Sequence, residues 1–222
     1  EIYRTGRNGP LNPTAAATAY YRAAAKGHPA AQRWMGDLPR DGIGVKANDE
    51  TAARWYRLSA AAGDATALSR YGECLRDGRG VARDPAAAVE YFRQSADLGD
   101  PDGLVQYGLL LEAGTETAKN PTAAFQLYQR AAQSGHAEAL YQQGRCWRDG
   151  IGTAKNASRA FQSLLDSATR GFVAAQYEVG VCYEKGAGVE RNGREAIEWY
   201  KKAARAGHSD ARKKMTASGS PW

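Results

Sequence analysis

Residues 175–207 read AQYEVGVCYEKGAGVERNGREAIEWYKKAARAG, and this stretch decides the fold. Apolar and small residues recur there at spacings of three and four, first in 175–184 and again in 194–206. Such spacing predicts two amphipathic α-helices, which we call helix A and helix B. The glycine-rich segment 186–193 between them predicts a turn. No stretch of the chain alternates with period two, so the sequence predicts no strands.

The same pattern returns every 36 residues along the chain. Two columns of glycine carry this period, one after helix B and one inside helix A. They are Gly27, Gly63, Gly99, Gly135, Gly171 and Gly207, and Gly36, Gly72, Gly108, Gly144 and Gly180. A fixed period of this length predicts a solenoid of stacked helical hairpins. Helix B is expected to begin near 14, 50, 86, 122, 158 and 194, and helix A near 31, 67, 103, 139 and 175.

The glycine inside helix A needs a packing reason, because glycine costs a helix about 1 kcal/mol relative to alanine. Helix B carries large side chains at one repeat position. They are Tyr20, Tyr56, Phe92, Tyr128, Leu164 and Tyr200. We expect the glycine to make room for these side chains, so that helix A and helix B approach each other closely.

These residues carry a resemblance to a known family. Helix A contains Ala-x4-Gly, the turn contains Gly-x-Gly, and helix B contains Ala-x2-[Trp/Tyr]-[Tyr/Phe]-x3-Ala-x2-Gly. The combination resembles the Sel1-like repeat, a relative of the tetratricopeptide repeat, in five consecutive copies over 31–207. The resemblance implies an all-α fold, an α/α right-handed superhelical solenoid of 36-residue helix-turn-helix repeats.

The repeat register predicts a single domain over 1–222. It divides into a partial repeat at 1–30, full repeats at 31–66, 67–102, 103–138, 139–174 and 175–210, and a C-terminal helix at 209–217. The first hairpin is incomplete, so we expect the chain to be a fragment of a longer protein.

Charge and hydropathy limit the kinds of partner that the chain can have. Thirty Lys and Arg against 24 Asp and Glu give a net charge of +6, which permits an acidic partner without requiring one. Basic residues gather near the C-terminus, where a solvated end is favoured over an anion site. They are Lys201, Lys202, Arg205, Arg212, Lys213 and Lys214. No long apolar run is present, so we expect no direct membrane insertion, and the compartment stays open.

The cysteines are predicted to be unpaired core residues. Cys74, Cys146 and Cys182 share one repeat position, which Leu38 and Leu110 occupy in other copies. The resemblance includes cysteine-rich bacterial members that join helix A to helix B by a disulfide in each repeat. Helix B carries no cysteine here, so that pattern is absent.

No residue is predicted to be catalytic or to hold a metal or cofactor. His28, His136 and His208 share a position just after the inter-repeat glycine, which favours a turn or capping role. They lie two or three repeats apart, too far to bind one metal ion. The Gly-x-Gly turns join helix to helix without a following Gly-Lys-Ser/Thr, so they are not phosphate loops.

The resemblance places a partner-binding groove on the concave face formed by the A helices. It maps to positions three before, one after and four after each helix A glycine. The candidate partner-binding residues are Arg33, Asp37, Arg40, Glu73, Arg76, Tyr141, Arg145, Arg148 and Tyr177. We find no packing reason in the sequence for Tyr141 and Tyr177 beside Arg145 and Arg148, whereas Tyr and Arg are enriched at binding hot spots. The alternative is that charged side chains only solvate this face.

The sequence therefore predicts a non-catalytic scaffold or adaptor that binds a protein or peptide segment, including one with acidic groups. The alternative is small-molecule binding or weak hydrolysis, because the cysteine-rich relatives are associated with penicillin binding and weak β-lactamase activity. Nucleic-acid binding is a third class, which the interspersed acidic residues disfavour. The oligomeric state stays open.

At two positions the sequence departs from the repeat, and each departure predicts a local change in conformation. Pro39 is expected to shorten or kink its helix A, because its ring clashes with the carbonyl four residues back. Glu116 stands where other turns carry Gly44, Gly80, Gly152 and Gly188, so the turn at 115–118 must be strained or different. We expect a different turn.

Overall fold

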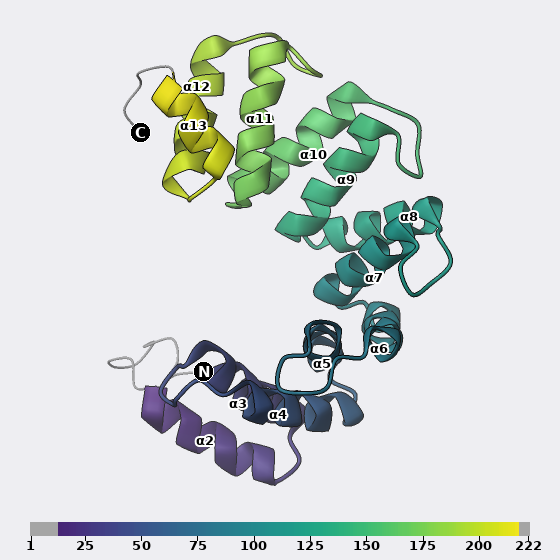
Figure 1. The fold of residues 1–222 in the computed structure, drawn as a ribbon, viewed down its shortest axis with the longest axis vertical. Coiled ribbons are helices and arrows are strands. Elements are labelled where there is room, and N and C mark those ends of the chain that lie inside the picture. Colours follow the sequence, from purple (N-terminus) through teal and green to yellow (C-terminus); the bar gives the residue numbers. More distant parts are fainter. Residues whose placement is uncertain (1–12, 218–222) are drawn as a thin grey trace. The chain divides into compact units, whose positions relative to one another are not determined.

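The computed structural model describes residues 13–217, and this part of the chain contains helices and no strand (Figure 1). The all-α repeat fold is therefore confirmed. The A helices are α3 (Pro29–Asp41), α5 (Ala65–Asp77), α7 (Pro101–Ala113), α9 (Ala137–Asp149), α11 (Val173–Lys185) and α13 (Ser209–Ala217). The B helices are α2 (Pro13–Ala25), α4 (Asp49–Ala61), α6 (Pro85–Asp97), α8 (Pro121–Gln133), α10 (Ala157–Thr169) and α12 (Gly193–Arg205).

Capping side chains set where the helices begin. The B helices start one residue earlier than predicted, and α4, α6, α8, α10 and α12 directly follow an Asn or Asp cap such as Asn48, which accepts a hydrogen bond from the Thr51 N–H. The A helices start two residues earlier, directly after the turn position that holds the histidines. His136 and His208 cap α9 and α13 through Nδ1, and His28 caps α3 without a side-chain hydrogen bond. The predicted turn or capping role is therefore confirmed, with a side-chain cap at His136 and His208 and the turn position alone at His28.

Close approach explains the glycine column. A Cβ atom added to Gly180 would lie 2.6 Å from the Tyr200 ring, and one added to Gly72 would lie 2.8 Å from the Phe92 ring. Real Cβ atoms do not approach a neighbour this closely, so only glycine lets helix A lie flat on the large side chain of helix B.

Two compact units make up the chain, unit 1 (Glu1–Tyr107) and unit 2 (Gly108–Trp222). In unit 1, Ala60, Ala67 and Leu68 form a buried cluster against Tyr91. In unit 2, a larger cluster contains Phe161, Leu164, Ala168, Ala175, Val179, Cys182 and Trp199. One continuous repeat domain, with the boundaries given above, stays a prediction, and residues 1–12 and 218–222 lie outside the described part.

The expectation that Pro39 shortens its helix is wrong, whereas the alternative of a kink stays a prediction. α3 has 13 residues and ends at Asp41, as α5 ends at Asp77 in the next repeat. Pro39 lies in the last turn, so it removes one backbone hydrogen bond only two residues before the helix would end. Gly42 then adopts a left-handed conformation, and its N–H bonds the Leu38 carbonyl.

The expectation of a different turn at 115–118 is also wrong. Glu116 adopts φ 56°, close to the 65–75° of Gly44, Gly80, Gly152 and Gly188. It is the one non-glycine residue with positive φ in the described part of the chain. The shared turn geometry therefore prevails over the residue's own preference, and Glu116 holds backbone strain of about 1–3 kcal/mol.

The cysteine prediction is confirmed. Cys74, Cys146 and Cys182 are unpaired and buried. Burial raises the pKa of their thiols to about 11, 12 and 11, respectively. A reactive cysteine needs the opposite shift, so these side chains act as core residues.

Candidate partner-binding face of helix A

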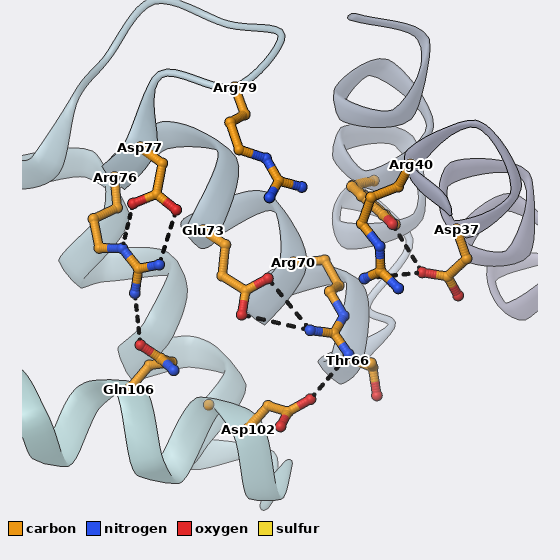
Figure 2. Close-up of polar contacts among 12 residues, drawn as sticks. Asp37, Arg40, Thr66, Arg70, Glu73, Arg76, Asp77, Arg79, Asp102 and Gln106 are labelled. Carbon is orange, nitrogen blue, oxygen red and sulfur yellow. Dashed lines mark hydrogen bonds and ion pairs between the residues drawn. The ribbon is translucent and has the colours of Figure 1, made fainter. Parts of the chain in front are cut away.

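In unit 1, arginines on the A helices are held by carboxylates of the same chain (Figure 2). Arg40 donates from Nε and Nη2 to the two oxygens of Asp41 at 2.8 and 2.9 Å. This fork lowers the pKa of Asp41, chiefly through its hydrogen bonds with Arg40. Arg76 makes the same fork with Asp77, and its Nη1 donates to Gln106 of α7 at 2.7 Å. The arginine side chains are thus fixed in orientation before any partner arrives.

Asp37 has a role inside the protein. It is only 8% exposed and accepts a 2.8 Å hydrogen bond from the buried Tyr56 hydroxyl. Arg33 bridges Asp37 at 3.4 Å and Asp64, the N-cap residue of α5, at 3.3 Å. Burial raises the pKa of Tyr56, and the charge of Asp37 adds to this shift. The expectation that Asp37 lies open on the groove is wrong, because it satisfies a buried hydroxyl.

Arg70, which is absent from the predicted set, joins this network. Its Nη1 lies 3.3 Å from Glu73, one of the predicted residues, and its Nη2 lies 3.3 Å from Asp102 of α7. Figure 2 shows Arg70 between these carboxylates, with Arg40 on the neighbouring helix. The signal available in the sequence is the repeat register, since Arg70 stands two residues before the helix A glycine.

In unit 2, the predicted arginines also pair within the chain. Arg145 donates from Nη2 to Glu112 at 2.9 Å, and Arg148 forks onto Asp149 at 2.9 Å. Arg148 also pairs through Nη1 with Glu178 of α11 at 2.9 Å. Their side chains are 24% and 38% exposed, so both remain accessible from solvent.

Tyr141 and Tyr177 have packing partners that the sequence did not reveal. Each lies against the residue just before the next A helix. The Tyr141 ring is 5.0 Å from the Phe172 ring, and the Tyr177 ring stacks on His208 at 4.5 Å. Both tyrosines are half-buried. Part of each ring therefore supports the stacking of repeats, and part faces solvent.

A buried tyrosine hydroxyl bonded to an acidic side chain of helix A recurs along the chain. In unit 2, Tyr128 donates to Glu112 at 3.0 Å and Tyr200 donates to Glu184 at 2.9 Å. Lys214 contacts both Glu184 and the Tyr200 hydroxyl, and its hydrogen bond is the chief cause of the lowered pKa of Glu184. The sequence contains this signal for Tyr128 and Tyr200, whose repeats carry Glu112 and Glu184 four residues after the glycine. It does not contain it for Tyr56, because Arg40 holds that position and the acceptor is Asp37.

The basic C-terminal end is partly neutralised by its own neighbours. Lys201 pairs with Glu198 at 3.0 Å and Lys213 with Asp210 at 3.1 Å. Lys202 lies over the Trp199 ring at 4.0 Å. Among residues 13–217, no helix has the length and apolar character to cross a membrane, and no three His, Cys, Asp or Glu side chains gather as metal ligands.

The fold and its helix A face define an α-helical repeat protein. A sequence model of the Sel1 repeat matches residues 1–28, 29–64, 65–100, 101–136, 137–162 and 173–208, and the chain belongs to the Sel1 repeat family. Sel1 repeat proteins are generally protein-interaction scaffolds, and their fold is typically non-catalytic. No curated protein matches the chain.

Solved structures agree with this family. A Sel1 repeat protein from Oxalobacter formigenes is 32% identical, with a TM-score of 0.84 over 97% of this chain and 86% of that chain. A protective antigen of uropathogenic Escherichia coli is 29% identical, with a TM-score of 0.73 over 95% of this chain and 45% of that chain. An immunity protein from Pseudomonas aeruginosa shares the fold at 23% identity, with a TM-score of 0.54 over 94% of this chain and 72% of that chain.

Proposed function

We propose that this protein is a non-catalytic scaffold whose helix A face binds a protein or peptide segment. The observation that carries the proposal is the arrangement in α9 and α11. There, half-buried Tyr141 and Tyr177 accompany Arg145 and Arg148, whose guanidinium groups are oriented by carboxylates of the same chain and still reach solvent. Groups that are already ordered lose less side-chain entropy when a partner binds.

The existing ion pairs determine how much the arginines and the tyrosines each contribute to the free energy of partner binding. Arg145 and Arg148 already have carboxylate partners, so a carboxylate from outside gains less from them than from an unpaired guanidinium. Tyr141 and Tyr177 pack against rings of the same chain but remain half-buried, and a large, partly exposed aromatic side chain is a typical hot spot. We therefore assign most of the affinity to Tyr141 and Tyr177, and orientation of the bound segment to the arginines.

A protein fits this face better than the other candidate ligands. Acidic and basic side chains alternate along it, whereas nucleic-acid binding needs a continuous basic stripe. The β-lactam alternative comes from relatives whose cysteines join helix A to helix B, whereas Cys74, Cys146 and Cys182 are unpaired and helix B carries no cysteine.

The test replaces both tyrosines with alanine. Binding partners would be purified from a lysate with the unchanged protein, and each would then be titrated calorimetrically against Tyr141→Ala/Tyr177→Ala. We expect affinity to fall by about 2 kcal/mol or more. The matched control is Tyr21→Ala, which removes an exposed tyrosine from a B helix.

Circular dichroism keeps the result interpretable, because the double variant should retain its helical signal. Unchanged affinity in the double variant, with loss in Tyr21→Ala, would place the binding surface on the B helices and overturn the proposal. Lysates that yield no partner meeting these criteria would count against a scaffold role for this chain.

A further inference from the structure

Successive A helices contact each other through side chains 30 residues apart, and the residue pairs are complementary. Arg76 donates to Gln106 at 2.7 Å between α5 and α7, within unit 1. Arg148 pairs with Glu178 at 2.9 Å between α9 and α11, and Glu184 pairs with Lys214 between α11 and α13. The first member stands four residues after the helix A glycine, and the second stands two residues before the equivalent position of the next A helix, which is glycine in α7 and α11 and Thr216 in α13.

At α3 and α5, the same register sets arginine against arginine. Arg40 occupies the first position and Arg70 the second. Figure 2 shows the two guanidinium groups reaching from neighbouring helices toward the same space. Burial lowers the pKa of Arg70 and so does the charge of Arg40, whereas Glu73 and Asp102 raise it and bring the balance above the ordinary value. The two cations therefore repel each other where the other contacts attract.

Each of these arginines keeps donors that the chain does not fill. Arg40 uses Nε and Nη2 on Asp41, and its Nη1 comes no closer than 3.6 Å to the Asp37 carboxylate. Arg70 uses Nη1 and Nη2, and within the described residues its Nε–H has no acceptor. The side chains are 23% and 27% exposed, so a ligand in solvent can reach both.

We propose that the space between Arg40 and Arg70 binds one carboxylate of an acidic protein segment, an inference that rests on the proposed scaffold function. A carboxylate oxygen between two guanidinium groups replaces repulsion by two charge-assisted hydrogen bonds. Asp37, Asp41, Glu73 and Asp102 surround the pair, so a singly charged carboxylate suits the site better than a doubly charged phosphate.

The experiment is a titration followed by the Nε–H NMR signals of arginine in the full chain. The probe is the capped tripeptide acetyl-Ala-Glu-Ala-amide, with the Gln tripeptide as a neutral control and inorganic phosphate as a second anion. We expect the Arg40 and Arg70 signals to shift together and to saturate with the Glu peptide alone. The Arg70→Gln variant recreates the Arg76–Gln106 contact at this position, and it should abolish the Arg40 response.

The matched control is Arg93→Gln, which removes the same charge from a B helix and should leave the titration unchanged. Three results would overturn the proposal. They are an equal shift of all exposed arginines, tighter binding of phosphate than of the Glu peptide, and a response that survives Arg70→Gln. None of these results bears on Tyr141 and Tyr177, so the scaffold proposal can fail or stand separately.

Discussion

The contact between α3 and α5 in unit 1 and the contact between α9 and α11 in unit 2 share one backbone register and differ in charge. Arg148 of α9 meets Glu178 of α11, whereas the same positions bring Arg40 toward Arg70. Both units keep the helix A glycine, the capped B helices and the left-handed turn glycines. The buried columns thus stack the repeats, and the side chains of the helix A face can change without disturbing the fold.

The largest effect we expect is a difference in stability between unit 1 and unit 2 at alkaline pH. Unit 2 contains Cys146 and Cys182, with thiol pKa values of about 12 and 11, and unit 1 contains Cys74, at about 11. An unfolded thiol ionises near pH 9, so the stabilisation is complete below pH 9 and is lost as pH rises through the folded values. Hydrogen exchange between pH 8 and 11 should show unit 2 losing protection first.

Leucine at the cysteine position provides the control for this pH dependence, because Leu38 and Leu110 stand there in other repeats. Cys146→Leu/Cys182→Leu should reduce the alkaline loss in unit 2. An unchanged pH profile in that variant would show that the thiols do not cause it.

Replacing the helix A glycine with alanine should destabilise either unit. Gly180→Ala places a Cβ 2.6 Å from the Tyr200 ring, and Gly72→Ala places one 2.8 Å from Phe92. We expect the free energy of unfolding to fall by about 1–3 kcal/mol in each case, measured by urea titration. Gly193→Ala is the control, since nothing lies within 4 Å of its Cβ. Equal stability of all three variants would contradict the close-approach argument.

Relief of the strained turn should stabilise unit 2 by a smaller amount. Glu116→Gly puts the permissive residue at φ 56°, and we expect a gain of about 1 kcal/mol in thermal or urea unfolding. The comparison variant is Glu190→Gly, another turn glutamate, which has no positive φ and should gain nothing. A loss of stability in Glu116→Gly would mean that the Glu116 side chain makes a larger contribution than its strain.

The smallest change in the free energy of unfolding is expected for variants of the charged contacts between A helices. Arg148→Gln breaks the pair with Glu178 and should cost less than about 1 kcal/mol, because the arginine is 38% exposed. Arg70→Gln loses contacts with Glu73 and Asp102 but also removes the repulsion from Arg40, so we expect its unfolding energy to stay near that of the unchanged protein. A clear loss in Arg70→Gln would show that the two arginines do not oppose each other.

Periodicity allowed the fold to be predicted from sequence, because the glycine, aromatic and capping columns each depend on local geometry. The helix A face was predicted only in part. Arg33, Arg40, Arg76, Arg145 and Arg148 are half-buried or exposed there, whereas Asp37 is buried against Tyr56. Such exceptions depend on contacts between neighbouring helices, which the pattern of a single repeat does not contain.

The lack of information on neighbouring segments also explains the other wrong predictions. Pro39 and Glu116 were judged by their own backbone preferences, and in both places the turn and its glycine cap determine the conformation. Arg70 was missed because it lies outside the positions taken from the family resemblance. The contact between residues 30 apart identifies it once one such pair is known.

The 30-residue spacing of the contacts between A helices also bears on how the chain folds. Every such contact forms within a stretch slightly shorter than one repeat, so the loop closed by each contact is short. Proteins dominated by short-range contacts fold fast, and a repeat array can nucleate at any point and grow by neighbours. Folding should therefore be able to start in either unit, and a mutation that slows one starting point leaves others available.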